Sequence, residues 1–136
     1  MLIRILVCVA FASMLSGCDS SQDPTSPTCS TAITIGRFSN GAPASPGQGQ
    51  VWTSYFQSTV LPAQASVYVV DISFTPNGCL TTWTAVSADT SAVQLSPASG
   101  IGSKQVELFM PANNDAQRST IVTIAGQAAT ITQAGR

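Results

Sequence analysis

Residues 66–75 read SVYVVDISFT, and this stretch decides the fold. Within it Tyr68, Val70, Ile72 and Phe74 are large, apolar and spaced two residues apart. Because successive side chains of a strand point to opposite faces, this spacing predicts a strand with one buried face. The many β-branched and aromatic residues of the stretch favour the same structure.

The same alternation recurs on both sides of this strand. No stretch shows a convincing helical period, and Gly, Pro and Asn residues separate the segments. Residues 36–50 are expected to form a loop, Pro76-Asn77-Gly78 a turn and Gly126-Gln127 a tight hairpin. Strands are also expected over 30–35, over 51–60, where the period is ambiguous, and near 93–95. Four further strands are expected to carry on one face, in turn, Cys79, Thr81, Trp83 and Ala85; Val106, Leu108 and Met110; Val122 and Ile124; and Ala129, Ile131 and Gln133. About seven short strands predict an all-β, immunoglobulin-like β-sandwich.

The N-terminus has the pattern of an export signal. One positive charge within residues 1–4 precedes an apolar run over 5–15, which is too short to span a bilayer as a helix. The run ends on Leu15-Ser16-Gly17-Cys18, which resembles the lipobox of bacterial lipoproteins at all four positions. The resemblance implies that residues 1–17 are a cleaved signal peptide and that Cys18 is acylated. The alternative is an ordinary secretory signal in which Cys18 is incidental.

The residues after Cys18 lack apolar side chains. Residues 19–28 read DSSQDPTSPT, so residues 18–28 are expected to form the acylated cysteine and a flexible tether before a domain over 29–136. Acyl chains would hold that domain on a membrane, in the bacterial cell envelope and outside the cytoplasm.

This arrangement gives the four cysteines different expected roles. Cys8 leaves with the signal peptide and Cys18 carries lipid, so Cys29 and Cys79 remain in a compartment where disulfides persist. We expect a Cys29–Cys79 bridge, with two free thiols as the alternative. Two cysteines in a chain without histidine cannot form a zinc tetrad, and no metal or other cofactor is expected.

The C-terminal half resembles a BACON domain, an immunoglobulin-like sandwich of bacterial surface and secreted proteins. The matching features are Gly78-Cys79 with Trp83, Gly100-Ile101-Gly102, Asn113 and Asn114 with Arg118-Ser119, and the closing VTIAGQAATITQAG. Such domains also open on Cys-x-x-x-Ile, which Cys29 to Ile33 match, and this feature agrees with the expected bridge. A second tryptophan of the family is missing, and the segment 36–65 is longer than the family's first connection. The family name implies an association with carbohydrate, although fold does not fix function.

Composition argues against several classes of function. Charged residues make up 8% of the chain and the net charge is -1, so the Lys/Arg surface of a nucleic-acid-binding protein is absent. There is no histidine for a Ser-His or Cys-His nucleophile. The acids of the mature chain are scattered, and their spacing predicts no pair of carboxyl groups across a cleft. An enzyme is therefore not expected.

A ligand platform is one interpretation of Trp52, Tyr55 and Phe56, because aromatic faces stack on sugar rings. The alternative is that these rings close the core, as Trp83 is expected to do, and Arg118 is expected to brace a turn. The sequence thus predicts a non-catalytic, lipid-anchored extracytoplasmic module that binds a glycan. The alternatives are a structural spacer of the envelope and a subunit that binds an envelope protein.

Overall fold

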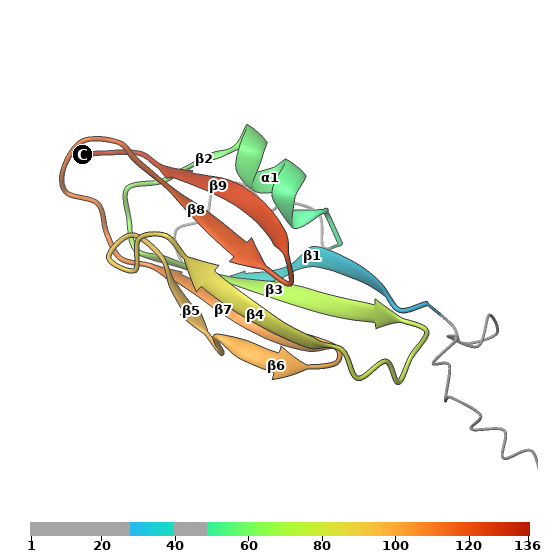
Figure 1. The fold of residues 1–136 in the computed structure, drawn as a ribbon. Coiled ribbons are helices and arrows are strands. Elements are labelled where there is room, and N and C mark those ends of the chain that lie inside the picture. The colour runs from blue at the N-terminus through green and yellow to red at the C-terminus, as the bar shows by residue number, and fades with distance from the viewer. Residues whose placement is uncertain (1–27, 40–48) are drawn as a thin grey trace, which may run out of the picture.

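The computed structural model describes residues 28–39 and 49–136, and it shows two β-sheets packed face to face (Figure 1). A four-stranded sheet has the order β1-β3-β7-β5, and a five-stranded sheet has the order β2-β9-β8-β4-β6. The strands are β1 (Ser30–Ser39), β2 (Val60–Leu61), β3 (Ser66–Thr75), β4 (Thr82–Ser87), β5 (Gln94–Ser96), β6 (Ser99–Ile101), β7 (Lys104–Met110), β8 (Arg118–Ile124) and β9 (Gln127–Gln133). The predicted all-β sandwich is confirmed, with nine strands in the described residues, of which β2, β5 and β6 have two or three residues.

The core lies between the sheets, and most of its strand residues are those whose parity predicted burial. Every pair in the described sheets is antiparallel except β2 with β9. The inner face of the four-stranded sheet is formed by Ile33, Ile35, Tyr68, Val70, Ile72, Phe74, Val106, Leu108 and Met110, and that of the five-stranded sheet by Trp83, Ala85, Val122, Ile124, Ala129 and Ile131. Period-2 alternation therefore predicted nearly all of the sheet core.

The first strand is longer than the sequence predicted. β1 pairs with β3 as far as Ser39, across an irregularity between Ile35 and Arg37. Gly36 lies at this irregularity and packs against the carboxylate of Asp71 on β3, so a side chain there would collide with it. The loop predicted from residue 36 is thus wrong over 36–39, because a glycine can continue a strand through a bulge. Residues 40–48 lie outside the described part.

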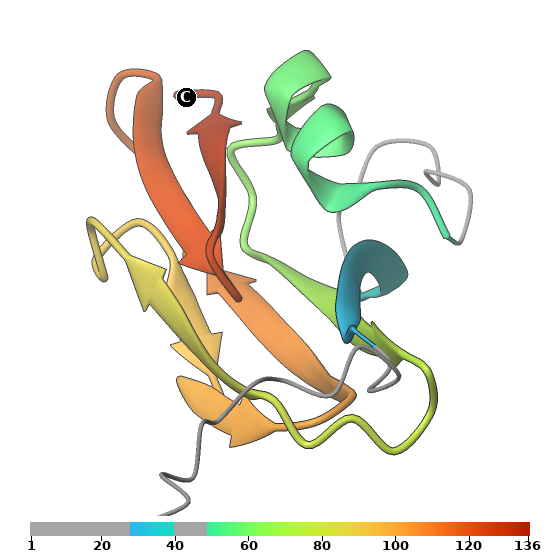
Figure 2. The same ribbon diagram turned by 45° about the vertical axis from the view of Figure 1, so that its right-hand side comes forward.

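A helix replaces most of the strand expected over residues 51–60. The helix α1 (Trp52–Ser58) is followed directly by β2. Figures 1 and 2 show α1 on the side of the sandwich where β1 of one sheet and β9 of the other lie apart. Trp52, Tyr55 and Phe56 face inward at the i, i+3, i+4 spacing of a helix. Seven residues are too few for this period to stand out from the sequence, and the aromatic residues favour strands when packing is ignored.

The structure also differs from two smaller predictions. In the strand predicted around Cys79, β4 starts at Thr82, so Trp83 and Ala85 are buried while Thr81 is exposed. The β8–β9 hairpin turns on Ala125 and Gly126, one residue earlier than predicted, since Gln127 pairs with Ile124. Both turn residues have positive φ, 46° at Ala125 and 79° at Gly126, as a type I′ turn requires.

Candidate functional site

The three aromatic residues proposed as a ligand platform lie in the core. Trp52 is 0% exposed, Phe56 1% and Tyr55 5%. Phe56 lies edge-on to its neighbours, with ring centroids 5.1 Å from Tyr55, 5.6 Å from Tyr68 and 6.1 Å from Trp52. A platform requires exposed ring faces, and these rings have none. The geometry is instead that of the alternative interpretation, in which α1 closes the sandwich.

The phenol groups of Tyr55 and Tyr68 meet where α1 packs on β3, with ring centroids 6.3 Å apart. Burial raises the pKa of both phenols, and at Tyr68 the nearby Tyr55 raises the pKa further. Both groups are therefore neutral at physiological pH. The pair belongs to the packing of the helix and offers no acid or base to a substrate.

The predicted disulfide is present. Cys29 and Cys79 are bonded, their Cα atoms are 6.1 Å apart, and the bridge spans 50 residues of sequence. In the chain-entropy description a bridge of this length stabilises a fold by about 4 kcal/mol. Structural disulfides are typical of proteins outside the reducing cytoplasm, so the bridge indicates an extracytoplasmic domain.

The proposed lipidation residue, Cys18, and the predicted signal peptide over 1–17 lie outside the described residues, as does the tether up to residue 27. Over residues 28–39 and 49–136, no helix is long and apolar enough to cross a membrane. In the same ranges no group of three or more His, Cys, Asp or Glu residues could hold a metal ion.

Two carboxylates lie closer together than the sequence spacing suggested. Asp71 of β3 pairs with Gln105, and Glu107 of β7 pairs with Val69, so the two acids are diagonal neighbours on the outer face of the four-stranded sheet. Asp71 Oδ1 accepts a hydrogen bond from Gln105 Nε2 at 2.8 Å. Both acids stand on the outer surface of the sheet, and neither lines the hollows described below. A glycosidase needs its two carboxyls on either side of a bound sugar, whereas these two acids lie on the same face of one sheet.

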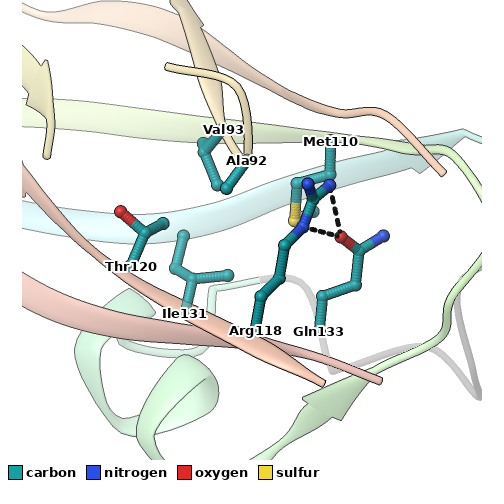
Figure 3. A pocket seen from close by; sticks show the side chains of 7 residues that line it. All are labelled: Ala92, Val93, Met110, Arg118, Thr120, Ile131 and Gln133. Atoms are coloured by element: carbon teal, nitrogen blue, oxygen red, sulfur yellow. Dashed lines mark hydrogen bonds between the residues drawn. The ribbon is translucent and has the colours of Figure 1, made fainter. Parts of the chain in front are cut away.

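Arg118, which was expected to brace a turn, joins Gln133 at the end of β9 (Figure 3) to the β7–β8 loop. Its Nε and Nη2 donate to Gln133 Oε1 at 3.1 and 2.9 Å, and Nη2 also donates to the Pro111 carbonyl at 3.0 Å. Gln133 is 3% exposed and donates from Nε2 to the same carbonyl. The cavity beside Arg118 has a volume of about 10 Å³, which is no more than the space of one water molecule. This cluster therefore ties strands together and has no room for a ligand.

A different surface, the outer face of the five-stranded sheet, has features suited to binding. We call it the hydroxyl face. On its three long strands it carries no ionisable side chain, and five of the nine outward residues are threonines: Thr82, Thr84, Val86, Ser119, Ile121, Thr123, Ala128, Thr130 and Thr132. Val86 and Ile121 are more than half exposed. The hydroxyls of Ser119 and Thr132 form a cross-strand hydrogen bond of 2.9 Å.

A shallow, open hollow of about 380 Å³ lies at one end of this face. Ile121 and Thr130 form part of its lining with Ser119, and Ala88 and Asp89 of the β4–β5 loop complete one rim. Asp89 Oδ1 accepts hydrogen bonds from the hydroxyl and the amide of Ser91 at 2.6 and 2.9 Å, which hold the pKa of this exposed carboxyl below its usual value. The hollow thus combines an aliphatic surface, two hydroxyls and one ionised acceptor.

This surface was not predicted from the sequence. Its signal was present in the segments TTWTAVS and RSTIVTI, where the residues between the buried ones are threonine, serine and aliphatic residues without a charge. Polar outward residues on a strand usually read as ordinary solvent-facing positions. Their shared location became visible once the register placed Ile121 beside Thr130 and Val86 beside Thr123.

Comparison with known proteins adds little. No family model matches the chain. No curated protein matches it either. Among solved structures, a Bacteroides ovatus GH5 xyloglucanase in complex with a XXXG heptasaccharide aligns with 60% of this chain at 17% identity and a TM-score of 0.49. The aligned part is 18% of the enzyme chain. The class that the described residues define is an extracytoplasmic, disulfide-bonded β-sandwich.

Proposed function

We propose that this chain is a lipid-anchored, non-catalytic module that binds neutral carbohydrate on the hydroxyl face. The anchor rests on the lipobox-like sequence Leu15-Ser16-Gly17-Cys18. The binding role is supported above all by one observation, the hollow at Ile121 on a face whose long strands carry no charge. A similarity to BACON domains, if it extends to function, points the same way.

The chemistry of the face suits an uncharged glycan. Sugar rings have apolar C–H surfaces and hydroxyl groups at their edges. In the hollow, Ile121 can contact the C–H surface, and Ser119, Thr130 and Asp89 can hydrogen-bond with the hydroxyl groups. Ligand sites of this kind combine an apolar surface with a few polar groups that fix orientation. An uncharged polymer would cover the long strands without burying a charge there, and its hydroxyls could donate to the Asp89 carboxylate at the rim. Because the hollow contains no aromatic ring, we expect each single site to bind the glycan weakly. Many copies anchored on one membrane would bind the same polymer more strongly.

A protein partner is the second candidate. Val86 and Ile121 are exposed aliphatic residues on a face without charged side chains, and the centres of protein interfaces are also depleted of charge. In that case the chain would be a subunit or spacer of the envelope with no glycan ligand.

The proposed absence of catalysis follows from the distribution of reactive groups. The chain has no histidine, and the two described acids that lie near each other, Asp71 and Glu107, stand on the outer face of the four-stranded sheet and do not line the hollow, while Asp89 and Asp115 lie in separate loops. A hydrolase would need two such groups converging on one bound substrate.

Affinity electrophoresis of the mature chain in detergent, through gels that contain neutral glucans, xylans or mannans, tests the binding role. The variant Ile121→Lys places a charge in the hollow, and Phe109→Lys places one on the outer face of the other sheet, where Phe109 is 40% exposed. We expect retardation of the wild type and of Phe109→Lys, with at least a tenfold weaker effect for Ile121→Lys.

Equal retardation of the three proteins would place the glycan site elsewhere. No retardation by any neutral polysaccharide at millimolar sugar would overturn the glycan proposal. It would leave the protein partner, which crosslinking at position 121 in intact envelopes would then identify.

A further inference from the structure

Two exposed aliphatic residues lie together at one end of the sandwich, on the β3–β4 loop and the β6–β7 hairpin. Leu80 is 79% exposed, the highest value among the exposed large hydrophobic residues of the described chain, and Ile101 is 53% exposed. The two segments are joined by a hydrogen bond from Gly102 N to the Thr81 carbonyl at 2.9 Å, and Ile101 pairs with Thr82. We call this pair of residues with its two segments, 76–82 and 99–104, the apolar tip.

The apolar tip is held in place by hydrogen bonds to neighbouring strands. Trp83 Nε1 donates to the Gly102 carbonyl at 2.9 Å, and Phe74 N donates to Ser103 Oγ at 2.9 Å, so the hairpin is held on both sides. Gly102 has φ +65° and approaches the Cys79 carbonyl closely. Leu80 and Ile101 are therefore held outward by ordered backbone and have no core of their own to enter.

The chain enters the domain at this same end. Cys29 begins the described fold beside β1, and its disulfide to Cys79 fixes that entry point one residue from Leu80. Cys18 precedes Cys29 by 11 residues, a length that spans at most about 40 Å when fully extended. If Cys18 is acylated, the apolar tip lies at the end of the domain to which the anchor is attached. Figures 1 and 2 show the C-terminus at the opposite end.

The charge of the tip fits a lipid surface. Segments 76–82 and 99–104 contain no acidic residue, and Lys104, exposed at the start of β7, is their one ionisable side chain apart from the bonded Cys79. The nearest acid along β3, Asp71, is hydrogen-bonded to Gln105. Aliphatic side chains flanked by a cation are the composition of segments that lie in the interfacial region of anionic bilayers.

We propose that Leu80 and Ile101 insert into the interfacial region of the bilayer that carries the acylated Cys18, with Lys104 against anionic headgroups. This proposal rests on the lipid anchor of the proposed function. The anchor confines the domain near the membrane, so the entropic cost of bringing the domain to the bilayer has already been met. Two side chains that insert to a shallow depth then suffice to select one orientation. The rest of the sheets would stand away from the lipid, and the hollow at Ile121, beside the far end of β4, would stay open to the surroundings.

Quenching by brominated lipids tests the insertion. The full mature chain, purified with its acyl groups, is reconstituted in vesicles of phosphatidylcholine with a minority of phosphatidylglycerol, with or without bromine on the acyl chains. The variant Leu80→Trp reports on the tip, and Phe109→Trp reports on the outer face of the four-stranded sheet. Trp52 and Trp83 are buried and give the same background in both variants.

We expect brominated lipid to quench the added emission of Leu80→Trp at least threefold more than that of Phe109→Trp. Equal quenching of the two variants in an acylated protein would overturn the proposed insertion of the apolar tip and leave the proposed anchor unaffected. An intact mass without acyl chains would instead overturn the anchor, and the tip with it. Both variants replace exposed side chains, so loss of folding is not expected to obscure the result.

Discussion

The hairpin residue Ala125 occupies a backbone conformation that L-amino acids with a Cβ rarely adopt. Its φ is 46°, and the following Gly126 has φ 79°. Two-residue turns of this kind prefer Asn-Gly, because Asn tolerates the left-handed region better than Ala does. The turn therefore contains a residue that is suboptimal for its conformation.

We predict that Ala125→Asn raises the free energy of unfolding by about 0.5–1 kcal/mol. Urea denaturation followed by tryptophan fluorescence measures the change. Ala128→Asn, at an exposed position of β9 in extended conformation, is the control and is not expected to stabilise the fold. A loss of stability in Ala125→Asn would show that the contact of Ala125 with the core matters more than its φ.

Asn113 fastens the C-terminal segment to the β7–β8 loop. It is 3% exposed, and Nδ2 donates to the carbonyls of Ala116 and Ala134 at 2.8 and 3.0 Å. Its backbone N–H donates to the Ala63 carbonyl at 2.7 Å. The sequence showed an Asn-Asn pair, but it could not show which member is buried, because the partners lie up to 50 residues away.

Asn113→Ala is expected to destabilise the domain by about 2–3 kcal/mol, since two carbonyl groups would lose their donor. Asn114→Ala, at the adjacent exposed position, should change stability by less than about 0.5 kcal/mol. Thermal unfolding of the two variants side by side checks the difference. Equal effects would contradict the assignment of Asn113 as the bracing residue.

At the scale of elements, parity predicted the strands well and failed at the helix. Residues such as Val106, Leu108 and Met110 were buried as their spacing required. The helix α1 consists of two turns whose aromatic residues also suit a strand, and its burial depends on the gap between β1 and β9. A gap between two sheets is a property of the tertiary structure, which a local pattern does not contain.

The packing of α1 leads to a prediction for Trp52. Its complete burial predicts that Trp52→Ala destabilises the domain by about 3–5 kcal/mol, whereas Gln57→Ala on the exposed side of the helix should be nearly neutral. Chemical denaturation monitored by circular dichroism measures both. A stable Trp52→Ala variant would show that the helix is an accessory and does not close the core.

The buried phenols of α1 and β3 predict a loss of stability at alkaline pH. Burial raises the pKa of Tyr55 and Tyr68 in the folded state, while tyrosine in the unfolded chain ionises near pH 10. Above about pH 10 the unfolded chain therefore releases protons that the folded chain retains, so the free energy of unfolding falls as pH rises. Below that pH the two phenols contribute no pH dependence.

Denaturation curves between about pH 8 and pH 11.5 measure this decline. Tyr68→Phe removes one of the two phenols, so its decline should be shallower than that of the wild type. Identical slopes for the two proteins would contradict the role of Tyr68.

At the scale of the whole molecule, the chain combines features that sequence and structure reveal separately. The sandwich and the Cys29–Cys79 bridge were predicted from alternation and from cysteine count, and the structure contains both. The hydroxyl face and the apolar tip emerged only from strand register and from the position of the bridge. Each brings together residues that lie on different strands or loops, which a reading along the chain does not connect.

The orientation of the molecule depends on its N-terminal chemistry. The bridge fixes the chain entry beside Leu80, so an anchor at Cys18 would present the apolar tip to lipid and keep the hollow at Ile121 accessible. A chain released without lipid would lose this fixed orientation. The covalent state of Cys18 is therefore central to both proposals.

The most direct test is the intact mass of the mature protein, extracted from the membranes of cells that express the full gene and measured before and after reduction. We predict a chain that begins at Cys18, carries diacylglycerol with or without a further acyl group, and gains two hydrogens on reduction as the Cys29–Cys79 bridge opens. A chain that begins at any other residue, or begins at Cys18 without lipid, would contradict the account of an anchored display module.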